Sequence, residues 1–123
     1  MSPVLAAAVI AAGVSGALLR FVVVTAAGAR GFPWAVLMVN VLGSAVAGVV
    51  LGLATTAGMD AELRVILLSG FCGGLTTFST FSVETIELVL DGKVRPAVLN
   101  VGLTLALGVG AAALGFGAVS LLG

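Results

Sequence analysis

The sequence contains no histidine and no tyrosine, and only one of its 123 residues is a cysteine. The missing histidine removes the side chain that most often serves as a general base or a metal ligand. It therefore argues against an intramembrane hydrolase that activates a serine through histidine. The single cysteine, Cys72, allows no internal disulfide and carries no information on the redox compartment. No pairing of a nucleophile with a base is evident, so we expect a protein that is not an enzyme.

Charge is also scarce, since 8% of the residues are charged, 61% are hydrophobic and the formal net charge is zero. A soluble domain carries about 25% charged residues, so this chain has too few to cover a surface exposed to water. The zero net charge gives no sign of a nucleic-acid partner. These values predict an integral membrane protein that is surrounded mainly by the lipid bilayer.

Stretches without charged residues are long enough to cross a membrane. A spanning helix needs about 20 apolar residues, and runs of about this length or longer occupy residues 1–19, 31–59, 65–83 and 96–123. No sustained alternation typical of a membrane β-barrel is visible. The sequence therefore predicts an all-α integral membrane fold, a single four-helix domain over residues 1–123. Its approximate helices are 4–26, 34–56, 63–90 and 96–122.

The third predicted helix is longer than one membrane crossing requires. Residues 63–90 number 28, about 42 Å at 1.5 Å per residue, against roughly 30 Å of hydrocarbon. A non-helical break near residues 73–77 removes the mismatch, with Gly73 and Gly74 as its natural place, although tilt of the helix also absorbs excess length. Carbonyls freed at such a break must be satisfied by protein, water or an ion. One chain supplies few of them, so we expect that a cation bound there would need two chains meeting at the break to complete its shell.

Neither the charges nor the small residues fix how the chain sits in the membrane. With four spans, the side of the termini carries Arg64, whereas the other side carries three cations: Arg30, Lys93 and Arg95. So few cations give only a weak bias under the positive-inside rule, which leaves both orientations open. Small residues such as Gly48 allow close helix approach, either within one chain or between two chains.

Polar side chains inside the predicted spans are costly and therefore suggest a function. Arg20 either has a structural role, in which it snorkels to an interface or pins backbone carbonyls, or forms an electropositive entry for anions. Asn40 either joins two helices or donates from its amide to a permeating anion. Asn100 and Thr104 lie one turn apart on the last predicted helix and form a short polar stripe.

The second half of the third predicted helix separates into two sectors at 100° per residue. Hydroxyls and carboxylates share one sector: Thr76, Thr77, Thr80, Glu84 and Glu87. Phe78 and Phe81 lie in the other; such rings usually pack against lipid or the core, but hydroxyl residues flank both here. Glu84 lies only about 10 Å from the helix end, so we assign it to a vestibule. A cation pathway would place acidic groups at its centre. Donors and ring edges occupy the centre here, which favours a small anion.

Three segments of the sequence resemble the Fluc (CrcB) family of fluoride channels: "GFCGGLTTFSTFS" from residue 70, "VNVLGS" from residue 39 and "GVSGALLR" from residue 13. The resemblance covers the whole chain in order and length. It implies an antiparallel, dual-topology homodimer in the bacterial inner or plasma membrane, with two fluoride pores and a central structural Na⁺. The implied function is passive export of cytoplasmic fluoride, which reduces fluoride toxicity.

The resemblance also implies roles for individual residues. Gly73 and Thr76 match the pair whose backbone carbonyls hold Na⁺, which is structural and not transported. Phe78 and Phe81 match the rings whose edges face fluoride. The remaining positions assigned to the anion pathway are Arg20, Asn40, Ser79, Thr80, Glu84, Asn100 and Thr104.

Two other classes of membrane protein remain as alternatives. A small multidrug-type cation exporter also has four helices, but proton-coupled export needs a carboxylate embedded in the first helix. Residues 4–26 contain none. A noncatalytic membrane assembly subunit would instead have a stable heteromeric partner and would carry no ion flux alone.

Overall fold

The protein folds into helices throughout the part of the chain that the structure describes. A computed structural model describes residues 1–28 and 31–122. Arg30, one of the cations counted for the orientation in the membrane, lies outside the described residues. The elements in chain order are α1 (Pro3–Ala27), α2 (Trp34–Thr56), α3 (Ala61–Val65), η1 (Ile66–Cys72), α4 (Gly73–Leu75), α5 (Phe78–Leu90) and α6 (Val94–Leu122).

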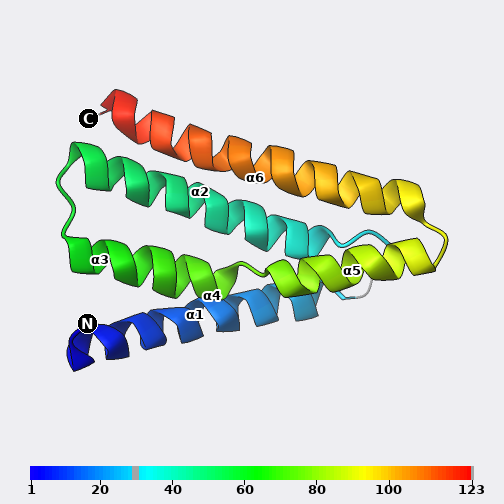
Figure 1. The fold of residues 1–123 in the computed structure, drawn as a ribbon, viewed down its shortest axis with the longest axis horizontal. Helices are drawn as coiled ribbons and strands as arrows, with labels where there is room; N and C mark the ends of the chain where they lie inside the picture. The colour runs from blue at the N-terminus through cyan, green and yellow to red at the C-terminus, as the bar shows by residue number, and fades with distance from the viewer. Residues whose placement is uncertain (29–30, 123) are drawn as a thin grey trace.

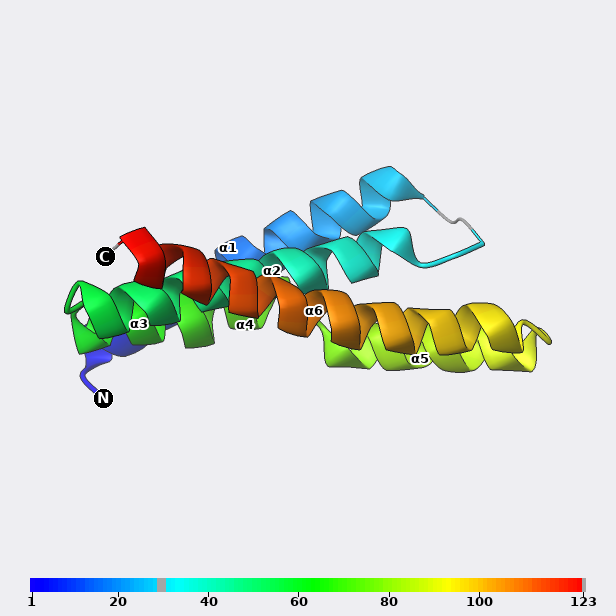
Figure 2. The same cartoon turned by 90° about the horizontal axis from the view of Figure 1, so that it is seen from above.

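Four helical spans in residues 1–28 and 31–122 are long and apolar enough to cross a membrane: Pro3–Ala27, Trp34–Thr56, Ala61–Leu90 and Val94–Leu122. The prediction of four long apolar helices is therefore confirmed. Figure 1 shows the spans side by side, with both termini at one end and the α5–α6 turn at the other. The closest packing joins α2 to α6 and α1 to η1 and α4. Figure 2 shows that α1 and the start of α2 diverge from α5 toward the end that carries the α5–α6 turn.

Short polar residues begin the first and third spans. The Ser2 hydroxyl accepts from the Leu5 backbone N–H at 3.1 Å and caps α1. Asp60 accepts from the backbone N–H groups of Glu62 and Leu63 at 3.1 and 3.3 Å, as expected for an acidic residue at a helix start. Gly92 has a φ of 76°, a left-handed conformation that glycine adopts without strain, and it reverses the chain between α5 and α6.

The third span is not one regular α-helix. Residues Ile66–Cys72 form a π-helix, and helical geometry ends at Leu75. Thr76 and Thr77 are extended, with φ and ψ of −85° and 156° and of −147° and 118°. Helical geometry resumes at Phe78, and Figure 1 shows the resulting non-helical link between α4 and α5.

The break lies inside the predicted range 73–77, at Thr76 and Thr77, but the glycine pair suggested as its natural place was wrong. Gly73 has helical φ and ψ of −61° and −39°, and both glycines belong to α4. Gly74 serves close packing instead, because a Cβ on it would collide with the backbone of Gly13 on α1, whereas a Cβ on Gly73 would make only an ordinary contact with the Leu68 carbonyl oxygen. Glycine is needed here for the helix contact, and the chain leaves the helix only after it.

Small residues also bring α2 against α6. A Cβ on Gly48 would collide with the Ala112 backbone, and a Cβ on Gly115 would lie 2.7 Å from the Ala45 carbonyl oxygen. Gly48 therefore packs against α6 of the same chain. Of the two alternatives raised by the sequence, contact within one chain or between two chains, it serves the first. This contact fixes the position of α2, which carries Asn40, relative to α6.

Substitution of Gly48 tests the contact between α2 and α6. Alanine raises helix propensity by about 1 kcal/mol at a helical glycine, but at Gly48 it forces the two backbones apart. Overpacking costs about 1–3 kcal/mol, so we expect Gly48→Ala to lower the thermal midpoint in detergent by about 5 °C or more. The matched control is Gly102→Ala on α6, where nothing lies within 4 Å of the added Cβ. Equal midpoints for the two variants would contradict the packing described here.

Candidate functional site

Asn40 and Thr77 form a pair of hydrogen bonds that joins α2 to the break in the third span. Asn40 Nδ2 donates to the Thr77 carbonyl oxygen at 3.1 Å, and the Thr77 backbone N–H donates to Asn40 Oδ1 at 2.7 Å. The side-chain amide thus satisfies both backbone polar groups of an extended residue that is only 6% exposed. A buried backbone group without a partner is costly, so this pairing allows the helix to stop at membrane depth.

The Thr77 side chain starts the next helix. Its hydroxyl oxygen accepts from the Thr80 backbone N–H at 3.1 Å, and it donates to Thr80 Oγ1 at 3.1 Å. Ser79 Oγ lies 3.3 Å from the same hydroxyl. Three hydroxyls therefore gather at the N-terminus of α5, where the helix dipole is positive. This arrangement suits a partner that carries negative charge.

The same hydrogen bonds remove the helical donors of two carbonyls. In a continuous helix, the Thr77 N–H would bond to the Gly73 carbonyl and the Thr80 N–H to the Thr76 carbonyl. Here the Thr77 N–H donates to Asn40 and the Thr80 N–H donates to the Thr77 hydroxyl. Gly73 is also exposed on the surface of the single chain. Two backbone carbonyl oxygens at the break have therefore lost their helical N–H donors, and such oxygens suit a bound cation.

Phe78 and Phe81 lie together at the start of α5. Their ring centroids are 5.8 Å apart and the ring planes meet at 46°. Phe78 is 79% exposed, whereas Phe81 is half-buried. Since the edge of a phenyl ring is electropositive, the two rings extend the positive character of the neighbouring hydroxyl cluster.

Arg20 shares a hollow with the break. The hollow holds about 360 Å³ and is lined by Ala17, Arg20, Phe21, Val24, Thr25, Thr77 and Thr80. Arg20 is half-buried, and its Nε is a buried donor without a hydrogen-bond partner among the described residues. The structure thus places an unpaired guanidinium donor beside the threonine hydroxyls, which gives the hollow two kinds of donor for an anion.

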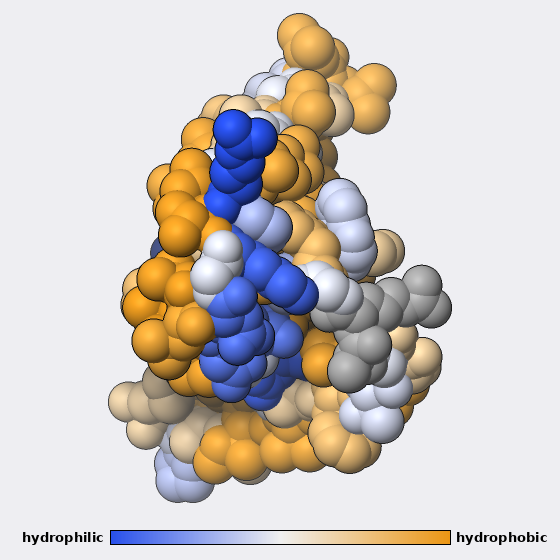
Figure 3. All heavy atoms as spheres, turned by 90° about the vertical axis from the view of Figure 1, so that its right-hand side faces the viewer, coloured by the Kyte–Doolittle hydropathy of each residue, from blue (hydrophilic) through white to orange (hydrophobic). Residues whose placement is uncertain are grey.

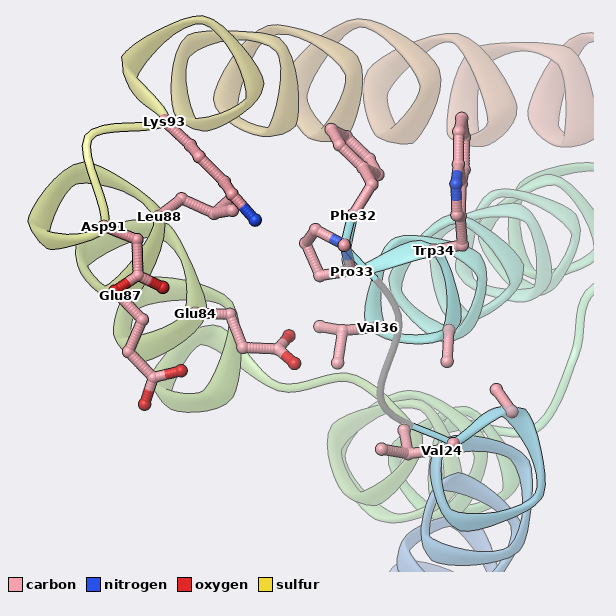
Figure 4. Close-up of a pocket in the computed structure, with 14 residues that line it drawn as sticks. Val24, Phe32, Pro33, Trp34, Val36, Glu84, Glu87, Leu88, Asp91 and Lys93 are labelled. Atoms are coloured by element: carbon pink, nitrogen blue, oxygen red, sulfur yellow. The ribbon is translucent and has the colours of Figure 1, made fainter.

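Glu84 faces a second hollow at the end of the molecule that carries the α5–α6 turn. This hollow, of about 280 Å³, is lined by α5, by the start of α2 and by the end of α1. Figure 4 shows Glu84, Glu87 and Asp91 along α5, and Lys93 reaching in from the turn. Figure 3 shows hydrophilic side chains gathered on this end, with apolar surface around them. We name this hollow the vestibule.

The vestibule adjoins the Arg20 hollow, because Val24 lines both. Glu84 is half-buried, and its Oε1 has no hydrogen-bond partner in the described part of the chain. The two hollows therefore neighbour each other between the α5–α6 end of the molecule and the break in the third span, and each contains a buried polar atom without a partner among the described residues.

Asn100 and Thr104 on α6 lie away from both hollows. Asn100 is 1% exposed, and its Nδ2 donates to Thr85 Oγ1 on α5 at 2.9 Å. Thr104 is half-buried, and its hydroxyl has no partner in residues 1–28 and 31–122. The structure thus joins Arg20, Asn40, Thr80 and the phenylalanines around the break, and it places Asn100 in a contact between helices.

Two residues of this arrangement were missed as site residues. Thr77 connects Asn40, Ser79 and Thr80, and its signal is a threonine just before a helical segment, the position of an N-cap. Thr85 lies one turn after Phe81 and bonds to the Phe81 carbonyl at 2.7 Å. No local signal identifies Thr85, because its importance depends on Asn100 of another helix.

Comparison with known proteins finds a family profile and relatives that match most of the chain. A family profile described as CrcB-like protein, Camphor Resistance (CrcB), matches residues 7–116. The fluoride-specific ion channel FluC 1 of Thermobifida fusca is 47% identical over 107 residues, covering 85% of this chain and 86% of that protein. The fluoride-specific ion channel FluC of Geobacter sulfurreducens is 44% identical over 111 residues, covering 87% and 88%.

A third relative covers the same share of this chain as the Thermobifida fusca protein. The fluoride-specific ion channel FluC of Renibacterium salmoninarum is 43% identical over 113 residues, which cover 85% of this chain and 90% of that protein. These bacterial relatives and the four apolar helices identify a multi-pass bacterial membrane protein. Since the profile and the relatives span most of its length, the chain belongs to the CrcB-like family.

Proposed function

We propose that this chain forms a fluoride-selective channel through which cytoplasmic fluoride leaves the cell passively, so that fluoride toxicity is reduced. The observation that supports it most is the concentration of donors at the break: the hydroxyl cluster, the α5 N-terminus and the Phe78–Phe81 pair. The relatives named as fluoride-specific ion channels support the choice of anion.

The donors at the break suit an anion that must shed part of its hydration and then leave again. Arg20 attracts the anion to the hollow beside the break, where the hydroxyl of Thr80 replaces water, and the hydroxyl of Ser79 joins the same cluster through Thr77. The Asn40 amide has two N–H groups and uses one for the Thr77 carbonyl, which leaves the other to donate to the anion. Neutral donors and ring edges bind more weakly than a full positive charge, and weak binding is required for conduction.

The groups farther from the break have different tasks in this proposal. Glu84 lies in the vestibule, where water still hydrates the anion, and Lys93 at the same mouth offsets part of the negative charge of Glu84, Glu87 and Asp91. Thr104 contributes to the anion pathway a buried hydroxyl on α6, which has no partner among the described residues.

A structural Na⁺ and a second chain belong to the same proposal. The carbonyls of Gly73 and Thr76 would hold Na⁺, because their helical donors bond elsewhere. One chain offers too few carbonyls for the ion, whereas two antiparallel copies meeting at the break provide a fuller shell of backbone oxygens. The exposure of Gly73 and Phe78 supports this contact, as does the weak charge bias, which permits dual topology. The ion would fix the two breaks to each other and would not be transported.

Removal of the Phe78 ring tests the channel directly. Wild-type protein reconstituted in Na⁺-loaded liposomes should release fluoride when a membrane potential drives it, as measured with a fluoride electrode. We expect Phe78→Ile to lower the efflux by about 100-fold or more, because an aliphatic side chain has no electropositive edge. Gel filtration should still show a dimer of the variant.

The matched control is Phe116→Ile near the end of α6, far along the chain from the break. We expect this variant to retain efflux close to that of the wild type. Unchanged efflux in Phe78→Ile would show that the ring is not part of the pathway, and wild-type liposomes that retain fluoride would refute the channel itself.

Exchange of Na⁺ tests the proposed cation site. Replacement of Na⁺ by N-methyl-D-glucamine at constant ionic strength leaves the Gly73 and Thr76 carbonyls without a cation, so the dimer should dissociate or unfold at lower temperature. Since ligand binding stabilises by about 2.7 kcal/mol at 100 times the Kd, we expect a fall of several degrees in the thermal midpoint. Identical midpoints in the two salts would exclude Na⁺ from the break.

A further inference from the structure

Two successive hydrogen bonds join α6 to α5 between the break and the α5–α6 turn. Asn100 Nδ2 donates to Thr85 Oγ1 at 2.9 Å, and the Thr85 hydroxyl donates to the Phe81 carbonyl oxygen at 2.7 Å. We name these three groups the α5–α6 clamp. The clamp leads from a buried side chain on one helix to the backbone of a proposed pathway residue on the other.

Each group in the clamp has little freedom to bond elsewhere. A threonine hydroxyl has one proton to donate, and the proton of Thr85 goes to Phe81, so toward Asn100 this hydroxyl acts as the acceptor. Asn100 is 1% exposed, and a buried amide N–H that loses its acceptor keeps the full cost of its desolvation. Successive hydrogen bonds also polarise and strengthen one another. The clamp therefore favours one relative position of the two helices.

α5 depends on such a contact because the chain itself does not align it. Thr76 and Thr77 separate it from α4, so the helical register of α4 does not continue into α5. Outside this connection α5 packs mainly on α6 and only slightly on α2. Leu88 and Ala97, each three residues nearer the turn than Thr85 and Asn100, are buried as well. The clamp thus adds a directional contact beside an apolar one.

The register set by the clamp determines which α6 group lies level with Phe81. α5 and α6 run antiparallel from the turn near Gly92 (Figure 1). Thr104 lies one turn beyond Asn100, and Phe81 lies one turn before Thr85, so Thr104 and Phe81 are at the same level. The Thr104 hydroxyl is buried and has no partner among the described residues, which leaves it free to donate to an ion at that level.

We propose that Asn100 and Thr85 are positioning residues for anion selection. They hold α5 in the register that places the Phe81 ring level with the Thr104 hydroxyl, and neither touches the anion. The inference rests on the proposed fluoride channel and deepens it. It gives Asn100 a different task from the direct contact with the anion that the sequence suggested.

A double-mutant cycle in reconstituted full-length protein tests the clamp. Thr85→Val keeps the side-chain shape and removes the hydroxyl, and Asn100→Leu removes the donor. We expect each to lower the ratio of fluoride to chloride efflux on the order of tenfold, in line with the loss of a buried hydrogen bond. Because both act through one contact, the double variant should lower the ratio no further than the more affected single variant. Thr85→Ser retains the hydroxyl and should restore the wild-type ratio within about twofold.

Each other outcome has a defined meaning. A wild-type ratio in Thr85→Val overturns the proposal, and so does an Asn100→Leu loss that is far larger and adds to that of Thr85→Val, since it indicates direct contact with the anion. If a single variant fails to fold, the double variant, which leaves neither partner unpaired, decides: a lowered ratio supports the clamp and an unchanged ratio overturns it. Wild-type protein without fluoride efflux contradicts the proposed function instead. The clamp is then judged by thermal midpoints, where additive losses in the double variant overturn it.

Discussion

The paired hydrogen bonds between the Asn40 side chain and the Thr77 backbone are the constraint on which the rest of the site depends. In hydrocarbon, an extended residue leaves its N–H and carbonyl unsatisfied at a cost of several kcal/mol. Asn40 meets both groups, at 2.7 and 3.1 Å. Without this amide, a continuous helix through Thr77 would be favoured, because it would satisfy both backbone groups of that residue. The hydroxyl cluster, the diverted carbonyls and the start of α5 are all consequences of the helix stopping there.

This pairing in turn requires α2 and the third span to lie close together, which small residues permit. Gly43, three residues after Asn40, faces Thr76, where a Cβ would collide with the threonine methyl. On the opposite side, Gly16 of α1 lies where a Cβ would reach the Phe71 carbonyl and the Leu75 backbone nitrogen. Glycine is thus used on both neighbours of the third span. The polar site is held in place by backbones in contact, with few long side chains between them.

The sequence was sufficient for the four apolar helices and the family, because hydropathy and the motif around residues 70–82 are local properties. The place of the break, in contrast, is not determined by the local sequence. Gly73 and Gly74 suggested it by composition, but both are helical, and the missing Cβ of Gly74 serves the contact with Gly13. The helix ends at Leu75, and the extended Thr77 that follows is satisfied by Asn40, which lies 37 positions away in the chain. Asn100 was likewise ambiguous until Thr85, on another helix, was placed beside it.

A single interruption of a helix explains why a cation site and an anion pathway would adjoin. An interrupted helix has two new ends, and each end exposes the backbone groups of one sign. On the α4 side the carbonyls of Gly73 and Thr76 lose their helical donors, and in the proposed channel they would be the ligands of the cation. On the α5 side the N-terminus is electropositive, and Thr77, Ser79 and Thr80 place their hydroxyls around it. One short non-helical segment, itself without charged side chains, thus provides acceptors and donors at the same depth. Two oppositely charged ions bound on its two sides would each lessen the electrostatic cost of the other.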